Sequence, residues 1–95
     1  MREDAERMHT AEVETMINEW ESAHAQARRT QDQLLPLVVQ RREAALAAYR
    51  GGTGPLTSVL DARRALLDAE LALIAQQQAA AKAWVWLNFT VPDLE

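Results

Sequence analysis

Near the N-terminus, one group of side chains has the residue types of a metal site. His9 and Glu12 are three residues apart, and Met8 and Met16 flank them. A histidine and a carboxylate with this spacing share one face of a helix. A metal site, however, needs three or four converging ligands. We therefore predict no metal site here, and we expect His24, at a half-buried helical position, to be a packed or solvated residue.

A second group combines two carboxylates with a guanidinium. Asp61, Arg64 and Asp68 have i,i+3 and i,i+4 spacing, which predicts solvated ion pairs on a helix surface. Catalytic use of these groups would need a pocket, and two packed helices do not supply one. We expect neither enzymatic activity nor a bound cofactor.

Tyr49 and the tryptophans can each be interpreted as functional residues or as packing residues. Tyr49, beside a glycine-rich stretch, is either a gating residue or an amphipathic side chain that closes an apolar seam next to a turn. The tryptophans either form a surface for a ligand or lipid, or pack between helices. In the second reading Trp84 lies in the core, and Trp86 is exposed or packs against another subunit.

Composition limits the class of protein. Ninety-five residues allow one small domain, and a large share of the apolar residues are alanine, with only five aromatic residues. The net charge is −4 and the arginine doublets are isolated, so no positive surface for nucleic acid is expected. The absence of cysteine excludes disulfides and thiolate chemistry. The opening MREDAERMHT has no apolar core of a secretory signal, and no run of apolar residues is long enough for a membrane helix.

The first half of the chain predicts one long helix, over about residues 4–50. This interval has no glycine and a single proline, and apolar residues recur in it at helical spacing. At about 1.5 Å per residue it would be roughly 70 Å long, which is typical of coiled coils. Pro36 should kink the helix near residues 33–35. The alternative is two collinear helices, the second capped by Thr30 or Asp32.

A glycine-rich stretch then reverses the chain, over residues 51–55. Gly51 or Gly52 should end the first helix, because glycine adopts the left-handed conformation wanted there. Thr53 is a candidate N-cap for the next helix, and Pro55 suits its first turn. Such a short connection makes the two helices antiparallel neighbours.

The second helix is expected over about residues 55–89, with Pro92 ending it and residues 93–95 frayed. Two apolar rows repeat every seven residues, which predicts coiled-coil packing. The first row is Val59, Leu66, Leu73, Ala80 and Leu87, and the second is Leu60, Leu67, Ile74 and Ala81. Ala62, Ala69 and Ala83 would widen this stripe.

Folding the two helices about residues 52–53 places apolar residues opposite one another. Leu46 then faces Val59 or Leu60, and Trp20 falls near Trp84. Residues before about Val13 have no partner in the hairpin. So small a core barely offsets the entropy of ordering the chain. We therefore predict an antiparallel two-helix hairpin, a single all-α domain over residues 1–95, that packs against further helices or copies of itself.

The turn and the helix after it resemble the second periplasmic tip of the TolC family of outer-membrane efflux proteins. The resemblance covers roughly residues 10–92. It rests on Tyr49, Gly52, Thr53, Val59, Leu60, Asp61, Ala62, Arg63, Leu66, Leu67, Ala69 and Leu71. The stretches LLPLVVQRREAALAAY (34–49) and WVWLNFTVP (84–92) are similar to the heavy-metal (CzcC/CusC-like) branch.

The resemblance implies a function and partners. Family members are trimers of the outer membrane and periplasm that export substrates received from an inner-membrane pump through a periplasmic adaptor. It implies that Tyr49 lies at the tunnel entrance and that the turn, Gly51, Gly52, Thr53 and Gly54, contacts the adaptor. The chain departs from the family in having no signal peptide, no barrel strands and one hairpin, and in having Gly54 where some members have arginine. It is expected to be a partial member. The alternative is a free-standing hairpin that self-associates as a structural or interaction module.

Overall fold

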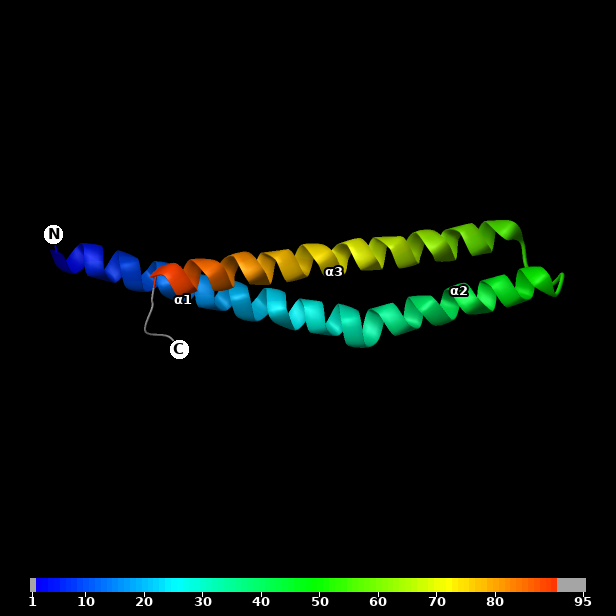
Figure 1. Cartoon of the computed structure of the whole chain (residues 1–95), viewed down its shortest axis with the longest axis horizontal. Coiled ribbons are helices and arrows are strands. Elements are labelled where there is room, and N and C mark those ends of the chain that lie inside the picture. Colours follow the sequence, from blue (N-terminus) through cyan, green and yellow to red (C-terminus); the bar gives the residue numbers. More distant parts are fainter. Residues whose placement is uncertain (1, 91–95) are drawn as a thin grey trace. The chain divides into compact units, whose positions relative to one another are not determined.

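The computed structural model describes residues 2–90, and it is helical almost throughout. The elements are α1 (Arg2–Arg29), a π-helical turn η1 (Thr30–Leu34), α2 (Leu35–Arg50) and α3 (Leu56–Thr90). α1, η1 and α2 follow one another without interruption and form the first arm of a hairpin, and α3 forms the second (Figure 1). The predicted all-α hairpin is confirmed. The expectations for Pro92 and for residues 93–95 lie outside the described residues.

The chain divides into two compact units. The first combines the beginning of α1 with the end of α3, and its described residues are 2–26 and 76–90. The second is continuous, from residue 27 to residue 75, and holds η1, α2, the turn and the first part of α3. Each unit is an antiparallel pair of helical segments.

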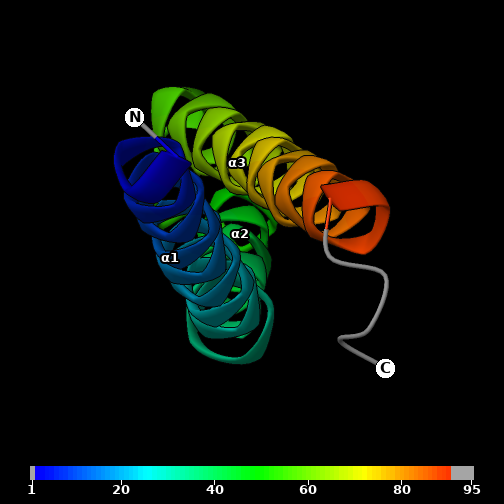
Figure 2. The same ribbon diagram turned by 90° about the vertical axis from the view of Figure 1, so that its left-hand side faces the viewer.

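In the first unit, alanines and one leucine form the buried contact. Its buried side chains are Ala23 on α1 and Ala83 and Leu87 on α3. Residues 2–12 are all exposed, and the blue first turns of α1 extend past the red end of α3 (Figure 1). The overhang predicted before Val13 is therefore present. Figure 2 views the molecule from the N-terminal end of α1. Among the described residues of this unit, no third helix covers the faces of α1 and α3 that point away from each other.

In the second unit the contact again consists of small side chains. Its buried residues are Ala27, Thr30 and Val38 on the first arm and Val59, Ala62 and Ala69 on the second. Small residues let two helices approach closely but bury little apolar area, which is the main source of folding free energy. No large side chain among the described residues is fully buried. The core of this unit is therefore thin.

The π-helical turn explains how the first arm passes Pro36. The Leu35 N–H donates to the Thr30 carbonyl, five residues back, and the backbone stays in the right-handed helical region. Neither η1 nor α2 begins with a side-chain cap, so the alternative of a helix capped by Thr30 or Asp32 is not observed. Pro36 lies in the first turn of α2, directly after the π-helical turn.

The π-helical turn also keeps the buried face in phase. One row of buried and half-buried positions on the first arm runs 27, 30, 35, 38, 42 and 45, with one step of five among steps of three and four. Five residues overshoot a single α-helical turn of 3.6 residues. A π-turn is wider and takes up the extra residue. The irregularity therefore begins at Thr30, several residues before the proline.

One of the two predicted apolar rows is not in the hairpin contact. Val59 is buried and Leu66 and Leu73 are half-buried, but Leu60, Leu67 and Ile74 are 55%, 55% and 50% exposed. The prediction was wrong for this second row. Consecutive residues on a helix point about 100° apart, so two rows offset by one residue do not share a seam. The alanines three residues beyond the first row, Ala62, Ala69 and Ala83, take that place.

The tryptophans also depart from expectation. Trp84 is 54% exposed, so its assignment to the core was wrong, while Trp86 is half-buried. On α1, the rings of Trp20 and His24 stack with centroids 5.3 Å apart and planes 9° from parallel. Residues four apart lie one turn above each other on a helix, which brings these rings together. His24 is thus exposed but has an aromatic neighbour.

Candidate functional site at the hairpin tip

The tip, residues 49–56, is closed by hydrogen bonds that converge on the end of α2. The Thr53 N–H donates to the Ala48 carbonyl over 2.9 Å, and the Gly52 N–H donates to the Tyr49 carbonyl over 3.1 Å. These are the two bonds of a Schellman motif, with Gly52 as the left-handed residue. They satisfy carbonyls that a helix end otherwise leaves without partners. The predicted end of the first helix at Gly51 or Gly52 agrees with this geometry.

Ala48 provides the central acceptor. Its carbonyl also accepts from the Gly54 N–H over 3.1 Å and from the Thr53 hydroxyl over 3.2 Å. Thr53 was predicted to cap the following helix, and this was wrong, because its side chain closes the preceding one. α3 instead starts after Pro55, whose carbonyl accepts from the Ser58 N–H over 3.2 Å. Ala48 itself carries no polar side chain, so residue type gave no signal of its role.

Two of the three glycines are required by geometry, for different reasons. Gly52 has a φ of 76°, which side chains other than glycine rarely adopt. At Gly54 an added Cβ would lie 2.9 Å from the Ala48 Cβ, closer than two carbon atoms tolerate. Gly51 has an ordinary φ of −81°, and a Cβ there would lie 3.3 Å from the Ala47 carbonyl oxygen and 3.9 Å from the Ala48 carbonyl oxygen.

The surface of the tip is apolar and weakly charged. Tyr49 is 45% exposed and Leu56 is 49% exposed, while Gly51, Gly52 and Thr53 are exposed as well. Arg50 is the only charged side chain between residues 44 and 60. The exposed polar side chains at this surface are Tyr49, Arg50 and Thr53, and residues 49–56 contain no histidine, cysteine, lysine or carboxylate. Its chemistry suits the docking of another protein surface by shape and apolar contact.

The residues considered for metal binding do not form a site. His9 and Glu12 are exposed on α1. Within residues 2–90, no group of three or more histidine, cysteine, aspartate or glutamate side chains is placed to hold a metal ion. In the same part of the chain no helix is long and apolar enough to cross a membrane.

The carboxylates of α3 do not pair with Arg64 in the structure. The ion pairs of the described residues are Arg7–Glu3, Arg28–Asp32 and Arg42–Glu43. The predicted surface pairs of Asp61, Arg64 and Asp68 are thus absent within this part of the chain, because nothing fixes long solvated side chains in one geometry.

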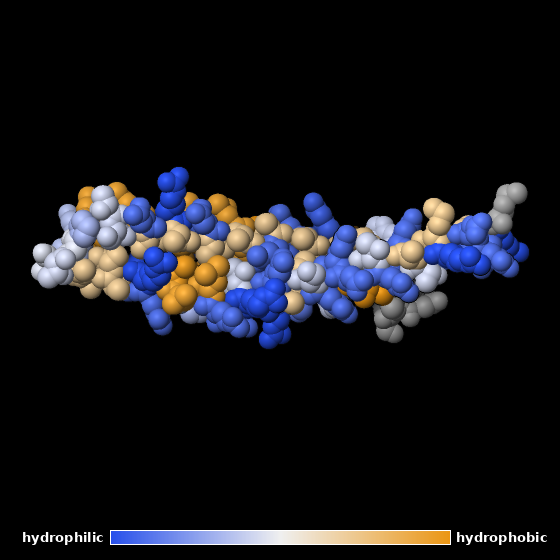
Figure 3. All heavy atoms as spheres, turned by 180° about the vertical axis from the view of Figure 1, so that it is seen from behind, coloured by the Kyte–Doolittle hydropathy of each residue, from blue (hydrophilic) through white to orange (hydrophobic). Residues whose placement is uncertain are grey.

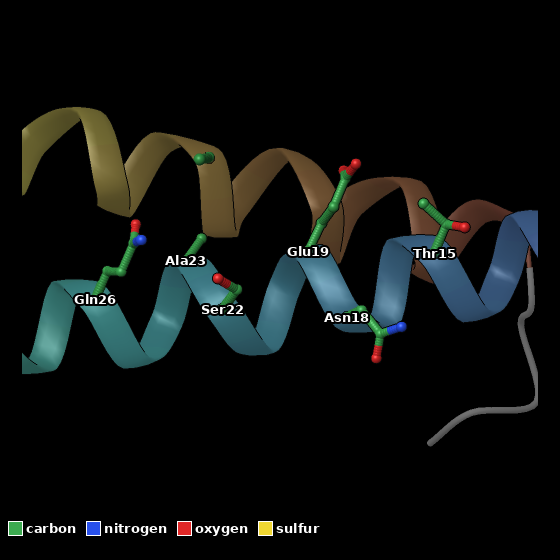
Figure 4. Close-up of a pocket in the computed structure, with 7 residues that line it drawn as sticks. Thr15, Asn18, Glu19, Ser22, Ala23 and Gln26 are labelled. Carbon is green, nitrogen blue, oxygen red and sulfur yellow. The ribbon is translucent and has the colours of Figure 1, made fainter.

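The hollows on the surface are shallow and their polar groups do not converge. One in the first unit is lined by residues of α1 together with Ala79 of α3. In Figure 4 the side chains of Glu19 and Asn18 point to opposite sides of α1, while Ala23 and Gln26 point toward α3. Convergent polar groups are what a ligand site requires, so this hollow is a groove between two packed helices.

Comparisons with protein-family models, with curated proteins and with solved structures found no match to this chain. The tip is therefore the strongest candidate site on geometric grounds. It is the one place in the described residues where hydrogen bonds, a left-handed glycine and close packing fix an exposed surface.

Proposed function

We propose that this chain serves as a tip hairpin of a TolC-like outer-membrane efflux protein, which docks onto a periplasmic adaptor in the export of heavy-metal cations. The proposal rests mainly on the hydrogen-bonded geometry of the tip. Its backbone is fixed by five hydrogen bonds at the end of α2, and it presents Tyr49 and Leu56 to the outside. The resemblance in residues 49–71 supports the same assignment.

Rigidity is what a docking surface of this kind needs. Ordering a flexible loop on binding costs free energy, and a turn that is already fixed avoids most of that cost. Gly52 and Gly54 permit the fixed conformation, and the surrounding surface carries no charge except that of Arg50. An apolar tip with few charges fits end-to-end contact with the apolar tip of a helical hairpin.

Cross-linking tests the proposal. The chain has no cysteine, so a Thr53→Cys variant carries a single thiol at the tip, and a Gln40→Cys variant carries one on the exposed surface of α2. The probe is the purified adaptor of a heavy-metal tripartite pump. We expect cross-links from position 53 and not from position 40. Adding Gly52→Val should reduce the yield, whereas Gly51→Ala should not.

Equal yields from the two positions would contradict the tip assignment. A yield from position 53 that Gly52→Val leaves unchanged would do so as well, because the valine strains the turn and a docking tip must keep its shape.

A second function is a self-associating hairpin that acts as a structural or interaction module. The observation that favours it is the exposed row of large apolar side chains on α3, at Leu60, Leu67 and Ile74. Genes for a pump and an adaptor next to the gene of this chain would favour the efflux role, and an isolated gene would favour the module. Sedimentation equilibrium measures the self-association directly.

A further inference from the structure

α3 carries a second apolar stripe on the side away from the hairpin contact. We define the outer stripe as Leu60, Arg64, Leu67, Leu71 and Ile74. Its four apolar members are each 50–55% exposed. All five residues belong to one helix and to the second unit. The space-filling view shows hydrophobic surface on the tip-bearing unit and mainly hydrophilic surface on the first turns of α1 (Figure 3).

The spacing of the outer stripe is that of a coiled-coil seam. Its members follow one another in steps of four, three, four and three residues. This alternation keeps side chains on one face that can meet another helix. The buried row of α3, which includes Val59, Ala62 and Ala69, has the same alternation. With about 100° per residue, the two stripes lie roughly 150° apart, so α3 can pack against a helix on each side.

The exposed apolar area is large enough to matter. Four half-exposed side chains of leucine size present on the order of 400 Å², the size at which an apolar patch marks an interaction site. Two such surfaces together with their charged borders approach the roughly 1,200 Å² of a small stable interface. The hairpin has no further helix within its described residues to cover this patch.

Charges beside the stripe indicate the partner and its direction. Arg63 lies along one edge of the stripe and Asp68 along the other, and neither makes an ion pair within residues 2–90. When two copies of a seam run parallel, a residue on one edge meets the residue five positions later on the opposite edge of the other copy. Arg63 of each copy then meets Asp68 of the other. An antiparallel pair would bring each edge against itself: Arg63 would meet Glu70 of the other copy on one side, but Asp68 would face Asp68 on the other. The parallel pair has the two attractive contacts without this repulsion.

We infer that a second copy of this chain packs on the outer stripe, with the two α3 helices parallel and joined by reciprocal Arg63–Asp68 pairs. Arg64 lies within the seam, so the two Arg64 side chains of a parallel pair meet in one layer, which restricts register at a cost in stability. Asp61 lies three residues before Arg64 and Asp68 lies four residues after it, so a carboxylate flanks its positive charge on each side. The inference rests on the self-association given above as the second function and does not depend on the efflux proposal, since it concerns contacts between copies and not contacts with an adaptor.

Sedimentation equilibrium of the full-length chain tests the surface. Leu67→Gln should raise the dissociation constant at least about tenfold, the equivalent of one good apolar contact. Leu37→Gln is the matched control, because Leu37 is also 55% exposed but lies on α2, outside the stripe. Arg64→Leu should lower the dissociation constant about tenfold by completing the apolar seam. Far-ultraviolet circular dichroism verifies that each variant keeps its helicity.

Charge exchange and cross-linking test the direction. Arg63→Asp and Asp68→Arg should each weaken association about fivefold, as expected for two partly exposed pairs, and the double variant should regain the original affinity. Single cysteines at Leu60 and at Ile74 should each form a disulfide with the same position of a second copy. A cysteine at Gln40 should not.

Three results would overturn the inference. The first is a chain that stays monomeric at every accessible concentration. The second is an equal effect of the substitutions at positions 67 and 37. The third concerns a further variant, Leu67→Cys: a disulfide of position 67 with itself while positions 60 and 74 form none is the pattern of an antiparallel pair.

Discussion

Alanine substitution at the two neighbouring glycines, Gly51 and Gly52, should have different effects on stability. Gly52 has a φ of 76°, and an L-residue in the left-handed region costs about 1–2 kcal/mol. Replacing glycine also restricts the unfolded chain, which returns about 0.4–1 kcal/mol. Gly52→Ala should therefore lower the free energy of unfolding by about 1 kcal/mol. The unfolding free energy of Gly52→Asn should lie between those of the original protein and Gly52→Ala, because asparagine tolerates the left-handed region better than alanine.

Gly51→Ala is the matched control. Gly51 has a φ of −81° and a ψ of −1°, which alanine adopts without strain. Its Cβ would lie 3.3 Å from the Ala47 carbonyl oxygen, a close contact that offsets the gain from the unfolded chain. The net change should stay within about 0.5 kcal/mol of zero.

The measurement is urea or thermal unfolding, followed by far-ultraviolet circular dichroism at one fixed protein concentration. For a chain of this size, 1 kcal/mol corresponds to a shift of about 4–8 °C in the midpoint. The concentration is held constant because association raises apparent stability. Equal stability of Gly51→Ala and Gly52→Ala would refute the assignment of the left-handed residue and, with it, the Schellman geometry of the tip.

Three other predictions concern the packing of the second unit. Val59→Ala should lower the free energy of unfolding by about 2 kcal/mol because Val59 is 5% exposed, whereas Leu60→Ala should lower it by less than about 0.5 kcal/mol in the monomer. Similar losses for the two variants would show that the buried and exposed rows of α3 are assigned wrongly. Gly54→Ala should cost about 1–2 kcal/mol through its 2.9 Å approach to Ala48, and adding Ala48→Gly should recover part of this loss in a double-mutant cycle; strict additivity would contradict the contact. Pro36→Ala should raise the unfolding free energy by about 1 kcal/mol, since it restores a backbone donor in the first arm, and a decrease would mean that the ring packs favourably where it lies.

The helices and the turn followed from local physics. Strong helix formers without glycine specify the first arm, and the left-handed preference of glycine specifies where it ends. Helix propensity and the backbone preference of glycine act over a few residues, so they can be predicted from the sequence. The same reasoning did not distinguish Gly51 from Gly52, and it assigned Thr53 to the wrong helix. Both depend on which carbonyl the turn brings within hydrogen-bonding reach, and that is Ala48.

The sequence predicted only one of the two rows of the seam correctly, because a spacing of seven residues does not by itself define which face of a helix is buried. Val59 and Leu60 begin rows with the same period, and hydrophobicity favours the larger side chains of the second row. The structure buries Ala62 and Ala69 instead, because close approach of two helices selects small residues. The large side chains at Leu60 and Leu67 are left on the outside, where the sequence alone offered no reason to place them.

The sequence by itself determined the hairpin: two helices, their boundaries within a few residues and a glycine-rich reversal between them. Only the tertiary structure decided which face of α3 is covered, why the first arm contains a π-helical turn and which atoms close the tip. The physical reason is the range of the interactions. Helix propensity and turn chemistry act between neighbours in sequence, whereas seam choice and the acceptance of three hydrogen bonds by Ala48 depend on distances set when the segments pack.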